Sequence, residues 1–264
     1  MEKPFLELSQ YIYLISFLRY FIVSGIFFFI FYKLFRNKWF YKKIQSKSPK
    51  SKDYKREVGY SLATMFIFTS VGLTVFDTPL LQYTQIYAPI DKYGYFYWFV
   101  SIIAMIFLHD TYFYWMHRGL HHPKLYKYVH LIHHKSTNPS PWASLAFHPI
   151  EAVGEAFILY LVVFLIPFHP TAMLLFLSFI PVYNAYGHLG YEIMPKKFNK
   201  HFIGKWFNTS VNHNQHHEKF NGNYGLYFLF WDRWMGTIRD DYDERYAETD
   251  KKRAQKQVKE TKLG

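Results

Sequence analysis

The chain alternates between long apolar segments and short charged ones. Residues 11–32 carry a single charge, Arg19, and residues 60–76 carry none. A helix needs about 20 apolar residues to cross a hydrocarbon core about 30 Å thick, so the first segment is long enough and the second only just so. Both segments are typical of transmembrane helices.

Two further apolar segments follow. Residues 93–108 lead into a helix that we expect to continue past Trp115. Residues 156–187 are uncharged but are interrupted by Pro167 and Pro170. They are too long for one helix and fit a hairpin of two short spans. The pattern therefore predicts about four to five membrane segments.

Lysine and arginine in the short loops predict the orientation. Nine of these residues lie between 36 and 56, whereas Lys92 alone lies between 77 and 95. Because positively charged loops stay in the cytoplasm, we expect the first loop on that side. Counting the crossings onward places the later histidine-rich segments on the same side.

Composition narrows the chemistry. A net charge of +12 could indicate nucleic-acid binding, but 50% of the residues are hydrophobic and the charges are segregated into blocks. This segregation favours a membrane partner, and we expect no nucleic acid. The chain has no cysteine, so any metal must be held by nitrogen or oxygen ligands.

Histidines recur at a spacing that favours metal binding. The pattern His-x-x-His-His occurs twice, and a further pair of histidines lies four residues apart. Residues three and four apart share a helical face, and neutral imidazole binds iron, zinc, copper or nickel. Eight imidazoles exceed what one ion takes, so two metals are implied; a histidine-rich pH sensor is the alternative. The eight are His117, His121, His130, His133, His134, His213, His216 and His217.

The order of the motifs resembles the sterol desaturase and fatty acid hydroxylase superfamily of membrane histidine-box di-iron enzymes. The resemblance covers residues 110–237 and is carried by DTYFYWMHRGLH, HLIHH, FHPIE, HLG, HNQHH and NYGLYFLFWDRWMGT. It implies that the eight histidines are the box ligands and that His188 is a further one.

Four other residues are candidates at the edge of such a site. Some relatives carry a second histidine where this chain has Glu192, which could be a ligand, an acceptor for an imidazole N–H, or an interfacial charge, the reading we favour. His148 is a weaker ligand candidate, its other role being a hydrogen-bonded residue at the start of a helix. Asp110 and Asp232 could accept the far N–H of ligating imidazoles, or serve at helix ends and in ion pairs.

By the resemblance, the protein reduces oxygen at two iron ions and hydroxylates or desaturates an unactivated C–H bond. Zinc can replace iron during overexpression. The substrate would be a membrane lipid such as a sterol or a fatty acyl chain. With no cysteine and no Gly-x-Gly-x-x-Gly, the chain would need a separate electron donor, a ferredoxin or cytochrome with its reductase. The alternative function is a membrane metal transporter or a metal-binding protein that uses the histidine clusters.

The predicted fold is an all-α integral membrane bundle with a cytoplasmic, histidine-rich helical cap. We expect a single domain over 1–264: membrane helices over 1–110, a catalytic region over 111–239 that includes the hairpin of 150–187, and a charged tail over 240–264. The tail lacks an evident apolar face, so we expect a solvated, frayed end.

Overall fold

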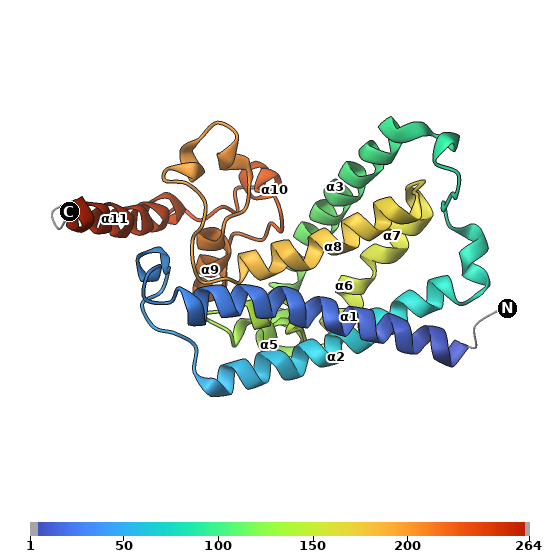
Figure 1. Ribbon diagram of the computed structural model, residues 1–264, viewed down its shortest axis with the longest axis horizontal. Helices are drawn as coiled ribbons and strands as arrows, with labels where there is room; N and C mark the ends of the chain where they lie inside the picture. Colours follow the sequence, from blue (N-terminus) through green and yellow to red (C-terminus); the bar gives the residue numbers. More distant parts are fainter. Residues whose placement is uncertain (1–4, 262–264) are drawn as a thin grey trace.

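Helices make up the regular structure of the chain in the computed structural model, which describes residues 5–261 (Figure 1). Over that range there is no strand, only isolated bridges such as Lys43 to Tyr191. The all-α prediction is confirmed. The main helices are α1 (Phe5–Phe28), α2 (Ser51–Phe76), α3 (Gly94–Leu120), α6 (Pro149–Ala156), α7 (Ile158–Leu165), α8 (Pro170–Gly187), α9 (Ser210–Lys219), α10 (Phe230–Trp234) and α11 (Tyr242–Thr261).

Three helical stretches are long and apolar enough to cross a membrane, namely Ser9–Leu34, Ser51–Phe76 and Gly94–Leu120. The first joins α1 to the π-helix η1 (Phe29–Leu34). The third continues past Trp115, as expected. The second begins earlier than its apolar residues predict, because the Asp53 carboxylate accepts the backbone N–H of Lys50 at 2.9 Å and caps the first turn.

The hairpin consists of α6 and α7 followed by α8. Its predicted break is confirmed: the chain leaves α7 at Leu165 and starts α8 at Pro170. Proline suits the first position of a helix, and the His169 side chain caps α8 by accepting the backbone N–H of Thr171 at 3.2 Å. Val162 of α7 packs with Met105 of α3 in the largest core cluster. The hairpin is thereby fixed against the third long helix.

The charged tail is a packed helix, so the expectation of a solvated, frayed end is wrong for the described residues. Helix α11 contacts α9 and the short helix η2 (Phe40–Lys42). Tyr242 and Tyr246 are buried, and the Arg253 guanidinium donates to the Met194 carbonyl at 2.6 Å. These three buried side chains recur at helical spacing, which is the signal that sequence reasoning missed. Residues 262–264 of the predicted tail lie outside the described range.

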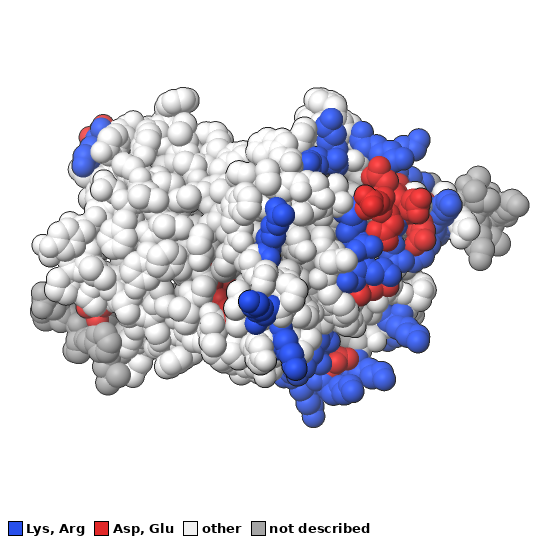
Figure 2. Space-filling view, turned by 180° about the vertical axis from the view of Figure 1, so that it is seen from behind, with Lys and Arg blue, Asp and Glu red and all other residues white. Residues whose placement is uncertain are grey.

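The bundle places the histidine-bearing helices toward the end of the molecule that carries α11 (Figure 1). Helices α1 and α2 contact each other, and α8 contacts both α1 and α3. Figure 2 shows Lys and Arg gathered over this same end, while the opposite end is nearly free of charge on the face drawn. The distribution of charge supports the orientation proposed from the loops.

A labelling experiment tests the orientation, because the chain has no cysteine of its own. Tyr83 is 65% exposed in the segment between α2 and α3, and Ser48 is exposed in the basic segment. We expect Tyr83→Cys to react with a membrane-impermeant maleimide in intact cells, and Ser48→Cys to react only after permeabilisation. The reverse pattern would contradict the assignment of the histidine-rich end to the cytoplasm.

Candidate metal centre

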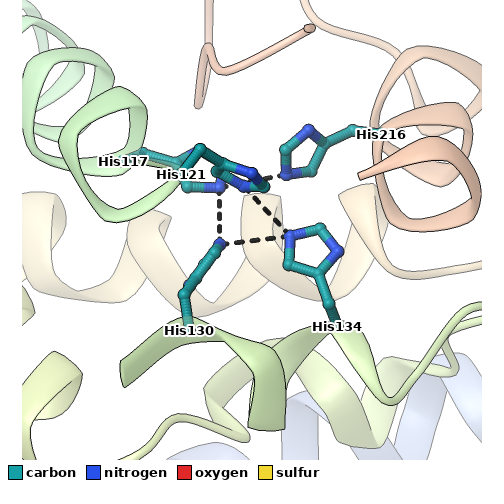
Figure 3. A group of neighbouring side chains, drawn as sticks. All are labelled: His117, His121, His130, His134 and His216. Carbon is teal, nitrogen blue, oxygen red and sulfur yellow. Dashed lines mark hydrogen bonds between the residues drawn. The ribbon is translucent and has the colours of Figure 1, made fainter. Parts of the chain in front are cut away.

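Five imidazoles from three parts of the chain converge in one buried group (Figure 3). One comes from the last turn of α3 and one from the residue that follows this helix, two from the segment 126–134, and one from α9. Their potential ligand nitrogens all lie within 4.8 Å of one another. We name this set group A, and its members are His117, His121, His130, His134 and His216.

Four further imidazoles form a second buried set within the same distance limit, which we name group B. Its members are His133, His188, His213 and His217. Neighbouring residues supply both groups, since adjacent positions on a helix point in different directions. His133 and His134 of α5 (Leu131–His134) divide between the groups, as do His217 and His216 of α9. The nine histidines singled out in the sequence are thus all brought together.

The imidazoles face one another through Nε2. The Nε2 atom of His117 lies 3.0 Å from that of His130 and 3.0 Å from that of His216, and the dashed lines in Figure 3 mark such contacts. In group B, the Nε2 atom of His213 lies 3.1 Å from that of His188 and 3.2 Å from that of His217. The nitrogens therefore converge on the middle of each group.

Backbone carbonyls determine which nitrogen carries the proton in three of these rings. The Nδ1 atoms of His117, His216 and His188 lie 2.9, 2.7 and 2.8 Å from the carbonyl oxygens of Tyr224, Gly222 and Asn184 respectively. A carbonyl can only accept, so each Nδ1 must be the donor and each Nε2 holds the lone pair. Two lone pairs, those of His117 and His216, then face each other across 3.0 Å.

Protonation of the imidazoles does not relieve this repulsion between lone pairs. Burial lowers the pKa of His216 and of His217 well below the usual range, and the neighbouring imidazoles lower it further. Neutral rings with converging lone pairs are the donors that a metal cation takes. Each group therefore fits a metal ion.

Glu151 is a site residue that sequence reasoning missed. Its carboxylate accepts the Nδ1–H of His130 at 2.6 Å, and both side chains are almost fully buried. Such a carboxylate fixes the tautomer of an imidazole ligand and its orientation. Glu151 lies in the first turn of α6, at the end of the FHPIE motif. The acidic residue of this motif, three positions after His148, was the sequence signal for this role.

The weaker histidine candidate, His148, lies outside both groups. Its Nδ1 accepts the backbone N–H of Ile150 at 3.2 Å and caps α6. This is the role of a hydrogen-bonded residue at the start of a helix. His122 and His169 cap α4 (Pro123–Leu125) and α8 in the same way.

Glu192 is fully buried, so the reading as an interfacial charge is wrong. Its Oε2 accepts the backbone N–H of Val211 at 3.0 Å, and its Oε1 accepts that of Met194 at 2.8 Å. Val211 is in the first turn of α9, where a negative charge is favourable. Glu192 belongs to neither histidine group and instead fixes the start of the helix that carries three of the nine imidazoles.

Asp110 and Asp232 bond to backbone N–H groups, so of the two roles considered for them the bonds to imidazoles are not formed. Asp232 accepts the backbone N–H groups of Tyr224 and Gly225 at 2.9 and 2.8 Å. Asp110 accepts the backbone N–H of Tyr227 at 2.8 Å. The Tyr224 carbonyl accepts from His117, so the aspartates hold the loop that orients this imidazole.

An apolar cavity of about 350 Å³ lies among α1, α2, α3, α6, α7 and α8. Phe113 and Phe147 line it, and their rings pack on His117 and His133 with centroids 4.9 and 5.0 Å apart. Both groups therefore border the cavity through an aromatic side chain.

Comparison with known proteins agrees with these features. The fatty acid hydroxylase family model matches residues 102–237. A Delta(7)-sterol 5(6)-desaturase of Gibberella zeae is 31% identical over 185 residues, which are 70% of this chain and 56% of the relative. The lathosterol oxidase of Rattus norvegicus is 31% identical over 70% of this chain and 60% of its own length. The lathosterol oxidase of Homo sapiens is 30% identical over 70% of this chain and 61% of its own length. The chain thus spans less than two thirds of these relatives. No solved structure matches it.

Metal content tests the two groups with a matched pair of variants. His216 and His217 are neighbours on α9 but belong to different groups. We expect His216→Ala and His217→Ala each to lower the metal content of the purified protein, and the double variant to lower it further, because each removes a ligand from a different ion. Elemental mass spectrometry on the monodisperse fraction measures this. The control is His201→Ala, at an exposed position, which should retain full content. Unchanged content in the double variant would contradict the assignment.

The role of Glu151 is tested by removing its acceptor oxygens. In Glu151→Leu the Nδ1–H of His130 loses its partner, and we expect metal affinity to fall about 10- to 100-fold. Glu151→Gln keeps one acceptor oxygen and should retain most of the affinity. Competition with a chelator measures both. Equal affinity of Glu151→Leu and wild type would show that the bond does not orient the ligand.

Proposed function

The chain belongs to the fatty acid hydroxylase family, within the sterol desaturase and fatty acid hydroxylase superfamily, and on this premise we propose that it hydroxylates or desaturates an unactivated C–H bond of a membrane lipid. The observation that carries the proposal is the position of the two histidine groups against an apolar cavity among membrane-capable helices. The family relationship favours an oxidoreductase over a metal transporter.

We propose that group A holds one iron ion and group B a second. Imidazole also binds other metals, so iron is inferred from the family, and zinc can replace it during overexpression. When bound, the two ions would supply the reduction of oxygen and the removal of hydrogen from the C–H bond. Five and four imidazoles match the number of ligands that one ion takes at each site.

The chain's own residues hold the donors in place and keep water away. Glu151 and the carbonyls of Tyr224 and Gly222 orient imidazoles of group A, so the donors need little rearrangement when an ion binds. Phe113 and Phe147 cover the cavity side of both groups with aromatic surface. An apolar wall favours the binding of an apolar chain or ring system next to the centre.

A sterol is the first candidate substrate. Relatives from a fungus and from two mammals are named for Delta(7)-sterols and lathosterol. The chain spans 56–61% of those three relatives, so fatty acyl and related lipids stay in the test set.

We propose that electrons come from a separate ferredoxin or cytochrome that docks on the cytoplasmic face. The basic segment 36–56 and α11 lie together, since the Lys252 ammonium donates to the Lys43 carbonyl at 3.2 Å. The Lys and Arg side chains in Figure 2 form a surface that would attract an acidic carrier. Such attraction weakens as salt is raised.

Turnover of defined lipids by the iron-loaded protein in vesicles tests the proposal. With oxygen, NADPH and a ferredoxin or cytochrome system, we expect a product that has gained one oxygen atom or lost two hydrogen atoms, as detected by mass spectrometry. His217→Ala should abolish product, because it removes a ligand of group B. Sustained turnover with NADPH alone would contradict the need for a carrier. Absence of product from sterols and fatty acyl lipids alike would contradict the enzymatic function.

A further inference from the structure

One carboxyl group lies on the wall of the apolar cavity without a partner from the protein. Glu155 of α6 lines the cavity and is 8% exposed. In the range 5–261, no hydrogen bond or ion pair engages this side chain. A buried polar group without a hydrogen bond costs free energy. A ligand that supplies the missing bond would therefore bind in preference to one that does not.

Glu155 is close to the metal centre. It follows Glu151 by four residues on α6, so the two residues share a helical face and are about 6 Å apart along the helix axis. Glu151 bonds to His130 of group A. A ligand group held by Glu155 would thus be about one helical turn from the carboxylate that orients a metal ligand.

A second buried polar group lines the same cavity. His109 of α3 is 4% exposed, and its Nδ1 lies 2.9 Å from the Tyr227 hydroxyl. When this hydroxyl donates to Nδ1, the Nε2 of His109 carries a proton. The cavity then offers an acceptor at Glu155 and a donor at His109. A hydroxyl group, which both donates and accepts, suits this combination.

The alternatives to a hydroxyl are less favourable. A lipid carboxylate would bring a full charge into the apolar cavity and, being an acceptor only, could not donate a hydrogen bond to Glu155. A lipid amine would have to bring a full charge into an apolar cavity, whereas a hydroxyl brings none. Arg19 of α1 also lines the cavity and would attract an anion, so a carboxylate lipid is one arm of the test.

We propose that Glu155 determines substrate specificity by accepting a hydrogen bond from the hydroxyl of a lipid alcohol. The polar end of the lipid then lies beside the centre, and the oxidised carbon lies within a few bonds of the hydroxyl rather than far along the apolar part. The position of the oxidised carbon rests on the proposed function. The binding preference does not, because it is a property of the cavity.

Equilibrium binding to the full chain in phosphatidylcholine nanodiscs tests the preference. The probes are lathosterol and octadecan-1-ol, each beside its deoxy hydrocarbon, together with stearate and octadecylamine. We expect at least one alcohol to bind about tenfold more tightly than its hydrocarbon, the effect of one hydrogen bond in an apolar site. Glu155→Leu should remove this preference, and Glu155→Gln, which keeps an acceptor oxygen, should retain it. Leu177→Ala is the control, because Leu177 lines the cavity without polar atoms and should weaken alcohol and hydrocarbon alike.

Three results would overturn the proposal: no alcohol binding more tightly than its hydrocarbon, a preference that survives Glu155→Leu, or stearate or octadecylamine as the tightest ligand. Mapping the oxidised carbon by fragmentation separates this inference from the proposed function. If the protein oxidises a lipid but Glu155→Leu keeps the preference for alcohols, the inference is wrong and the proposed function stands. If the preference for alcohols depends on Glu155 but no lipid yields a product, the proposed function is wrong and the binding preference stands.

Discussion

Repulsion between unshared electron pairs is the constraint on which the site depends. Nine imidazoles are packed into two buried groups, in which neighbouring Nε2 atoms are as close as 3.0 Å. Carbonyl acceptors hold the Nδ1 protons of His117 and His216 on the outer side. Such an arrangement is unfavourable for the chain alone, and burial prevents relief by protonation. A cation in each group would turn the repulsion into coordination, so we propose that metal binding and local stability are coupled.

Much of the fold around the site resists that repulsion. Asp110 and Asp232 bind backbone N–H groups of the loop that carries the Tyr224 carbonyl, Glu192 fixes the first turn of α9, and Glu151 reaches His130 from α6. These carboxylates come from four separate parts of the chain and are all buried. They support the donors without belonging to either histidine group. The same α6 also carries Glu155 to the cavity wall, so one helix links the histidine groups to the cavity.

The sequence predicted the features that depend on local spacing. Apolar runs of membrane length predicted the three long helices, and Pro167 and Pro170 marked the hairpin. The histidine spacing identified eight of the nine imidazoles that the structure brings together, and the family resemblance implied the ninth, His188. That these imidazoles bind metal stays a proposal. Partners far apart in the chain were beyond reach: Glu192 meets Val211 only through the fold, and nothing near Asp110 in sequence points to the N–H of Tyr227. The packed α11 was a local feature that could have been predicted, because Tyr242 and Tyr246 lie one turn apart.

The most direct test of two metal ions held by two histidine groups is an anomalous difference map at the iron edge, from crystals of protein purified with iron. The account predicts two peaks, one among the Nε2 atoms of His117, His130 and His216, and one among those of His188, His213 and His217. A single peak shared by both groups, or a peak away from the histidines, would contradict it.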